Sequence, residues 1–239
     1  MNLILDIGNS RTKLAVFDGK TKVSSARIDN LDCESFEKTI SNLVFDKIII
    51  SSVRIVPHFV TDILSSQGVF IHILSYKSKL PFEIQYKTPD TLGTDRIAAL
   101  AGAFNLFPNE NILIIDAGTA ITYDFLIKGI YKGGNISPGI NIRLKALHNF
   151  TDKLPLVSID EDFNSPGQTT HDAILSGVIN GTIYEINEYI RTFKKEYINN
   201  KIILTGGNSE YINTKLNEQI ICIPDLVNEG LNFILEYNV

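Results

Sequence analysis

Two stretches of the sequence place an aspartate two residues before a glycine, directly after an apolar run. They are Asp6-Ile7-Gly8-Asn9 and, about 110 residues later, Asp116-Ala117-Gly118-Thr119. Backbone N–H groups of a glycine-containing turn can bind an anion, and a lysine such as Lys13 adds positive charge. An aspartate beside such a turn can hold a divalent ion, usually through water. The pattern indicates phosphate and metal chemistry, although each stretch alone is equally compatible with a plain hairpin.

A third motif, Gly93-Thr94-Asp95-Arg96, precedes a run of small apolar residues that ends before Pro108. This composition predicts a helix, with Thr94 or Asp95 as its N-cap. The small residues could lie in an interface with a partner, or they could serve close packing inside the protein.

The elements that position the first turn are predicted by apolar runs and turn signals in the first 74 residues. Strands are expected at 3–7, 13–17, 22–28, 47–53 and 69–74, and helices at 32–45 and 57–66. The order βββαβαβ predicts a mixed sheet covered by helices. Residues 75–92, with Pro81 and Pro89, are expected to form a surface connection without regular elements.

The second half repeats the strand–turn–strand pattern around Asp116. Further expectations are a loop at 133–139, a helix running toward His148, a loop at 150–168, a long helix from Thr169-Thr170, and strands at 201–205 and 220–223 before a closing helix capped by Asp225. The self-similarity predicts two domains of one topology, 1–110 and 111–239, with both aspartate turns in one cleft between them.

Composition limits the class of protein. The 239 residues are 44% hydrophobic and carry 22 basic against 27 acidic residues, a formal net charge of −5 without blocks of like charge. This balance favours a small-molecule partner over nucleic acid or a membrane surface. No apolar run approaches the roughly 18 residues of a membrane span, and no basic region precedes the first strand, so we expect a cytoplasmic protein. The two cysteines and four histidines lack metal-ligand spacing.

The sequence contains neither a Walker P-loop nor a Rossmann fingerprint. Instead, the Asp6–Lys13 stretch, the Asp116–Thr119 stretch and Thr205-Gly206-Gly207 resemble the phosphate-1, phosphate-2 and adenosine motifs of the actin, sugar kinase and Hsp70 superfamily. The resemblance covers nearly the whole chain. It implies an α/β fold of two ribonuclease H-like domains of the same topology, separated by an interdomain cleft.

Within that superfamily, the combination of motifs resembles type III pantothenate kinase. The further motifs that carry this resemblance are Tyr86-Lys87-Thr88-Pro89, Gly93-Thr94-Asp95-Arg96 and Gly134-Asn135-Ile136-Ser137-Pro138-Gly139. The family implies ATP-dependent phosphorylation of pantothenate to 4′-phosphopantothenate, the first step of coenzyme A synthesis. It also implies a cytoplasmic homodimer that requires magnesium and a monovalent cation, K⁺ or NH₄⁺.

The resemblance assigns roles to individual residues. Asp95 is the expected proton acceptor, which a helix N-terminus would keep ionised, although simple N-capping is an alternative. Asp116 matches the monovalent-cation site, although it could be only a turn-stabilising residue. Asp6 is expected near the magnesium, through water. The expected ATP contacts are Asp6, Ile7, Gly8, Asn9, Ser10, Arg11, Thr12, Lys13 and Thr119, and the expected pantothenate contacts are Tyr86, Gly93, Thr94, Asp95, Arg96 and Thr170.

One position departs from the family pattern, because Ser10 stands where many members have threonine; the hydroxyl is kept, so we expect little effect. Two other functions stay open. A non-catalytic, nucleotide-binding regulator is disfavoured by the intact Asp6, Lys13, Asp95, Arg96 and Asp116. A superfamily kinase or phosphatase with another substrate is disfavoured by the Gly-Thr-Asp-Arg motif.

Overall fold

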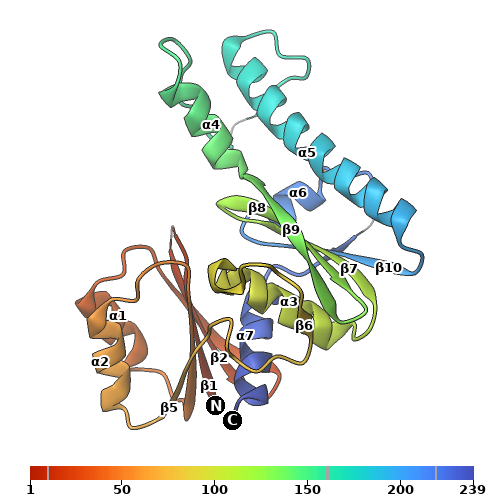
Figure 1. The fold of residues 1–239 in the computed structure, drawn as a ribbon. Coiled ribbons are helices and arrows are strands. Elements are labelled where there is room, and N and C mark those ends of the chain that lie inside the picture. Colours follow the sequence, from red (N-terminus) through yellow and green to blue (C-terminus); the bar gives the residue numbers. More distant parts are fainter. Residues whose placement is uncertain (10, 160–161, 219) are drawn as a thin grey trace. The chain divides into compact units, whose positions relative to one another are not determined.

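The computed structural model describes residues 1–9, 11–159, 162–218 and 220–239 (Figure 1). These residues form two compact units. The first comprises Met1–Glu110, Leu126–Gly133 and Asp225–Val239, and the second comprises Asn111–Phe125 and Gly134–Pro224. The domain boundary expected near residue 110 stays a prediction.

The first unit contains a five-stranded mixed sheet of order β3-β2-β1-β4-β5. Strand β1 is antiparallel to β2 and parallel to β4, which is parallel to β5. The predicted βββαβαβ order is confirmed, with these bounds: β1 Asn2–Ile7, β2 Thr12–Asp18, β3 Thr21–Ile28, α1 Cys33–Ile40, β4 Lys47–Ser52, α2 His58–Ser66 and β5 Phe70–Ile73.

Burial explains why these elements form. The apolar residues of β1 and of the run Ile48–Ile50 in β4 are fully buried, as expected for central strands covered on both faces. Helix α1 begins at a capping box between Asp32 and Ser35 and buries Phe36 against the sheet. It ends five residues earlier than expected, since Ser41 and the asparagine after it favour turns over helix interiors.

Two further helices of the first unit, α3 (Thr94–Leu106) and α7 (Leu226–Tyr237), pack with their backbones in close approach. A Cβ at Gly230 would lie 1.8 Å from the carbonyl oxygen of Ala98, and one at Gly102 would lie 2.5 Å from that of Leu226. Small residues of α3 therefore serve internal packing. The N-cap of α3 is Gly93, so the expectation of Thr94 or Asp95 at that position was wrong.

The second sheet has the order β11-β10-β7-β8-β9-β6. Its strands are β6 Glu83–Ile84, β7 Asn111–Ala117, β8 Ala120–Ile127, β9 Ile130–Pro138, β10 Asn200–Thr205 and β11 Ile221–Cys222. The order from β9 to β11 repeats the order from β3 to β5, and β10 is parallel to β7 as β4 is to β1. Asp6 and Asp116 thus occupy equivalent positions, each next to last in a central strand.

Two expectations about irregular segments were wrong. Residues 133–138 continue β9 instead of forming a loop, because pairing with β8 outweighs the low strand propensity of glycine and asparagine. Strand β6 and a 3₁₀ helix, Pro89–Thr91, lie in the segment expected to lack regular elements. Strand β6 forms because the N–H groups of Glu83 and Gln85 donate to the carbonyl oxygens of Gly129 and Tyr131.

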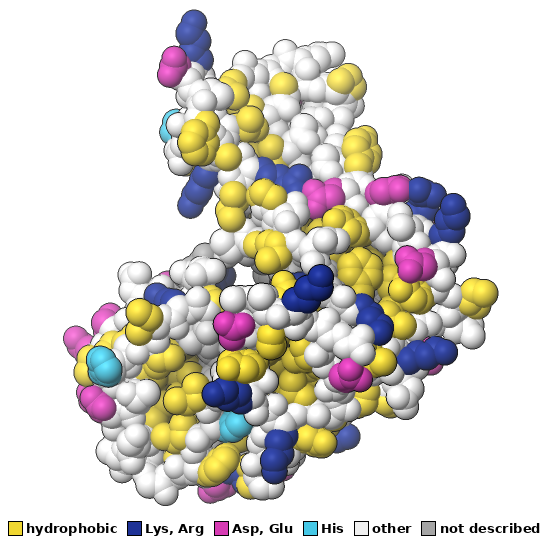
Figure 2. Space-filling view, in the orientation of Figure 1, with side chains coloured by type: hydrophobic (Ala, Val, Ile, Leu, Met, Phe, Trp, Pro, Cys, Tyr) yellow, Lys and Arg dark blue, Asp and Glu magenta, His cyan; other side chains and the backbone are white. Residues whose placement is uncertain are grey.

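Helices α4 (Ile140–Asn149) and α5 (Thr170–Glu196) of the second unit pack against each other (Figure 1). Helix α5 begins as expected, after an N-cap at Thr169 whose side chain accepts the N–H of Asp172. The short helix α6 (Ser209–Asn213) follows the loop after β10, and Asp225 is the N-cap residue of α7. In the described ranges no helix combines the length and hydropathy that crossing a bilayer requires. On the face drawn in Figure 2, basic and acidic side chains are interspersed.

Candidate functional site

The carboxyl ends of β1 and β4 bring together several of the predicted site residues. Asp6 lies opposite Lys13 of β2 in the antiparallel register and opposite Ser51 of β4 in the parallel register. Ser51 Oγ donates to Thr94 Oγ1 at 3.0 Å, and Thr94 Oγ1 donates to the carbonyl oxygen of Ser52 at 3.1 Å. The first turn of α3, which carries Asp95, is therefore fixed at this edge of the sheet.

The carboxyl group of Asp6 has an unusual acidity. Burial is the largest cause that raises its pKa from 3.8 to about 6, and the negative charge of Asp95 raises it further. The positive charge of Lys13 and a hydrogen bond with Ser51 act in the opposite direction. Asp6 and Asp95 thus lie close enough to repel each other, an arrangement that a cation would relieve.

The turn after Asp6 is tight. The N–H of Gly8 donates to the carbonyl oxygen of Arg11 at 3.1 Å, and a Cβ at Gly8 would lie 3.1 Å from the same oxygen. Asn9 and Arg11 are exposed, whereas Ile7 is buried. Thr12 is also buried, and its Oγ1 has no hydrogen-bond partner within the described ranges. Ser10 lies outside the described residues.

Glycine at position 93 makes room for the carboxyl group of Asp95. A Cβ at Gly93 would lie 2.4 Å from Asp95 Oδ1, which accepts the N–H of Arg96 at 2.8 Å. Asp95 is half-buried and occupies the second position of α3. The Asp95 carboxylate therefore lies at the N-terminal end of α3 and accepts a backbone N–H there.

Arg96 and Tyr86 meet at one tyrosine, Tyr131. Arg96 is 6% exposed, and its Nη2 donates to the hydroxyl oxygen of Tyr131 at 2.7 Å. The rings of Tyr86 and Tyr131 stack, with centroids 5.9 Å apart and planes at 25°. Two residues predicted to contact pantothenate, from different segments, therefore lie against the same side chain.

In the second unit, the turn after Asp116 packs against two glycine loops. The N–H of Gly139 donates to the carbonyl oxygen of Thr119 at 3.1 Å. A Cβ at Gly139 would lie 2.4 Å from that oxygen. Gly206, at φ +96°, approaches so closely that a Cβ would lie 2.3 Å from Asp116 Oδ1. Thr170 is exposed at the start of α5 and belongs to this second unit, unlike Tyr86 and Arg96.

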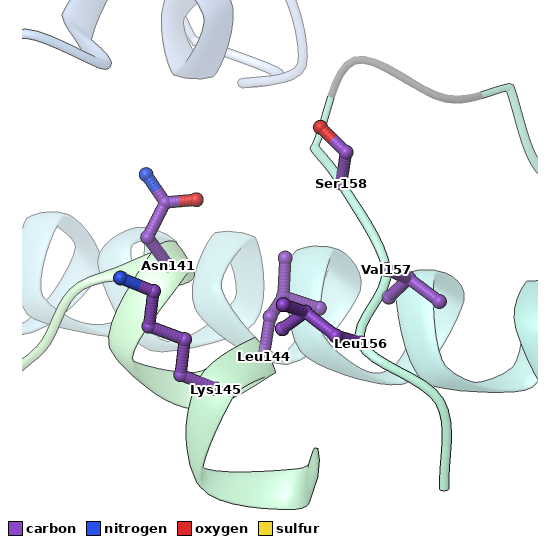
Figure 3. A pocket seen from close by; sticks show the side chains of 6 residues that line it. All are labelled: Asn141, Leu144, Lys145, Leu156, Val157 and Ser158. Atoms are coloured by element: carbon purple, nitrogen blue, oxygen red, sulfur yellow. The ribbon is translucent and has the colours of Figure 1, made fainter.

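Two cavities of the second unit are lined by residues other than the predicted site residues. One, of about 320 Å³, lies between α4 and the segment after it, and Figure 3 shows the side chains of Asn141, Leu144, Lys145, Leu156, Val157 and Ser158 around it. Another, of about 410 Å³, is lined by aromatic and acidic side chains, mostly from α5.

Sequence reasoning missed two residues of the first unit, Ser51 and Tyr131. A signal for Ser51 exists, because it is a polar residue at the carboxyl end of an apolar run, where open α/β sheets place ligands. Tyr131 carries no such signal, since its contacts depend on the pairing of β6 with β9.

The chain is similar in sequence and in structure to known proteins. The family model described as type III pantothenate kinase matches residues 2–192. A type III pantothenate kinase of Cytophaga hutchinsonii is 41% identical over 245 residues, which covers 100% of both chains. A solved structure from Campylobacter jejuni, described as a conserved Baf family transcriptional activator, is 25% identical with a TM-score of 0.64 and covers 99% of this chain and 98% of its own.

The ethanolamine utilization protein EutJ of Carboxydothermus hydrogenoformans is 14% identical with a TM-score of 0.57, covering 97% of this chain and 89% of its own. At that identity the likeness concerns the fold alone. Together with the repeated strand order of the two sheets, it confirms the predicted α/β fold of two ribonuclease H-like domains. By the family model and the full-length likeness to a curated member, the chain belongs to the type III pantothenate kinase family.

Proposed function

We propose that this enzyme transfers the γ-phosphoryl group of ATP to the primary hydroxyl of pantothenate, with Asp95 as the proton acceptor. Membership of the family makes the chain a kinase of coenzyme A synthesis. The observation that supports the residue assignment is the meeting of Asp6, Lys13 and the start of α3 at the carboxyl ends of β1 and β4.

Phosphoryl transfer depends mainly on positioning and on neutralising charge. In this proposal the backbone N–H groups of the turn between β1 and β2 hold phosphate oxygens, and Lys13 contributes a positive charge beside them. The Asp95 carboxylate accepts the proton of the attacking hydroxyl. It is suited to this role because it lies in the first turn of α3 and accepts the N–H of Arg96, two features that favour its ionised form.

The donor set of the first unit fits a magnesium ion that arrives with ATP. Magnesium is usually held by one or two carboxylates together with substrate phosphates, and a half-buried Asp6 close to the Asp95 carboxylate matches that pattern. Asp6 would hold the ion, through water. When bound, magnesium neutralises charge on the phosphates.

We further infer that Asp116 binds a monovalent cation, K⁺ or NH₄⁺, and that Thr119 contacts a phosphate. The family motif supports this, and so does the position of Asp116, which is next to last in β7 as Asp6 is in β1. The family resemblance also supports a cytoplasmic homodimer. The interspersed charges support an enzyme that acts without nucleic acid or a membrane.

A consumption assay tests the proposed reaction. The purified chain is incubated with Mg²⁺, K⁺ and ATP, and ADP formation is compared between pantothenate and a panel of sugars. We expect ADP formation with pantothenate alone; activity with a sugar, or none with pantothenate, would overturn the proposal. The regulatory alternative gains no support, because a relative at 41% identity carries the kinase name.

A further inference from the structure

We propose that Tyr131 is a positioning residue for pantothenate, which holds Tyr86 through its ring and Arg96 through its hydroxyl. The proposal rests on the proposed function, which assigns Tyr86 and Arg96 to pantothenate. Neither the sequence motifs nor the family resemblance pointed to Tyr131.

The backbone of Tyr131 fixes the segment that carries Tyr86. Strand β6 runs parallel to β9 with Ile84 opposite Tyr131, and the N–H of Gln85 donates to the carbonyl oxygen of Tyr131 at 3.0 Å. The Tyr86 ring then stacks on the Tyr131 ring. Because Tyr131 is fully buried, it is a rigid support for the half-buried Tyr86.

The hydroxyl of Tyr131 orients the other partner. A buried guanidinium must be hydrogen-bonded, and the Tyr131 oxygen accepts from Arg96 Nη2 at a distance typical of a strong bond. Its phenol oxygen is a neutral acceptor, so it fixes the direction of the guanidinium without adding negative charge. Phenylalanine would keep the stacking with Tyr86 and the ring face that lies 6.0 Å from the Arg96 guanidinium carbon, but it would lose the hydrogen bond to Arg96.

Replacement of Tyr131 by phenylalanine therefore removes the hydroxyl contact and leaves the ring contacts in place. For Tyr131→Phe we expect the KM for pantothenate to rise about tenfold or more, as is typical when a charged donor loses a buried acceptor, with the KM for ATP unchanged. The matched control is Tyr123→Phe, since Tyr123 is also fully buried and its hydroxyl donates to Glu185 in the second unit. The control should leave the pantothenate KM near that of the wild type.

A double-mutant cycle with Arg96→Lys gives a readout that a purely structural role would not move. If Tyr131 acts by holding the guanidinium, Tyr131→Phe should change the pantothenate KM less than twofold in the Arg96→Lys background. The proposal would be overturned if Tyr131→Phe raised the KM for ATP as much as the KM for pantothenate. It would also be overturned if Tyr131→Phe raised the pantothenate KM equally in the wild-type and Arg96→Lys backgrounds.

Crystal structures of the wild type and of Tyr131→Phe separate this proposal from the proposed function. If the wild type fails to phosphorylate pantothenate, the proposed function is wrong. The two structures still show whether Tyr131 positions Arg96 and Tyr86. We expect the Arg96 guanidinium to turn away and Tyr86 to stay in place. An unmoved Arg96 would overturn the role of the Tyr131 hydroxyl, and thermal melting of both proteins checks that the variant folds.

Discussion

Replacing Asp6 by asparagine should make the free protein more stable at neutral pH, although it removes a group proposed to hold magnesium. Burial, and then the charge of Asp95, raises the pKa of Asp6 from 3.8 to about 6 in the folded protein. The folded state therefore binds the proton more tightly than the unfolded state. The stabilisation from protonated Asp6 is full below about pH 4 and is lost as the pH rises through about 6.

The size of the effect follows from the shift. A rise of about two pKa units corresponds to about 3 kcal/mol at 1.36 kcal/mol per unit. Because Asp6 keeps some exposure at the edge of the sheet, water screens part of this penalty, and we expect about 2 kcal/mol. In a protein of this length, such a gain raises the melting temperature by about 4–8 °C.

Urea denaturation of the wild type and of Asp6→Asn, without ATP or Mg²⁺, measures the effect. The unfolding free energy of the variant relative to the wild type should increase by about 2 kcal/mol between pH 4 and pH 8, since other titrating groups are common to both proteins. The difference in unfolding free energy between variant and wild type could instead stay constant over this range or decrease with pH. Either result would refute the reasoning that an ionised, partly buried Asp6 destabilises the folded protein.

Two further substitutions test the close contacts of glycine residues. Gly93→Ala puts a methyl group 2.4 Å from Asp95 Oδ1; it should displace that carboxylate and lower kcat about a hundredfold, with an unchanged circular dichroism spectrum. Normal kcat would show that the position of Asp95 is not critical. Gly230→Ala meets the backbone oxygen of Ala98 and should destabilise the fold by about 3 kcal/mol or more in urea denaturation. Gly177→Ala is the matched control for Gly230→Ala, because a Cβ at Gly177, within α5, would meet no atom within 4 Å. This control should stabilise the folded protein by up to about 1 kcal/mol. Equal effects of the two alanines would contradict the close packing of α3 and α7.

Local chemistry made much of the fold predictable. The strands of the first unit follow from apolar runs that end at turn residues, and the equivalence of Asp6 and Asp116 follows from one repeated pattern. These features depend on neighbouring residues, so the sequence reveals them. The same reasoning failed for 133–138, where glycine and asparagine indicate a loop but the neighbouring strand determines the conformation.

Residues that meet through long-range pairing were not predictable. Ser51 reaches Thr94 because β4 runs parallel to β1 and α3 begins at the same edge. Tyr131 meets Arg96 and Tyr86 only after a two-residue strand pairs with β9. The N-cap of α3 illustrates the same point, since the side chains of Thr94 and Asp95 make contacts other than capping and leave that position to Gly93.

The role of Asp95 as proton acceptor is the central claim, and the turnover of Asp95→Asn tests it most directly. Pantothenate-dependent ADP formation is measured for the wild type and the variant at saturating ATP, Mg²⁺, K⁺ and pantothenate. We expect a folded variant with the melting behaviour of the wild type and a kcat lowered by about 10²- to 10⁴-fold. A variant that turns over at the wild-type rate would contradict the role of Asp95 as proton acceptor.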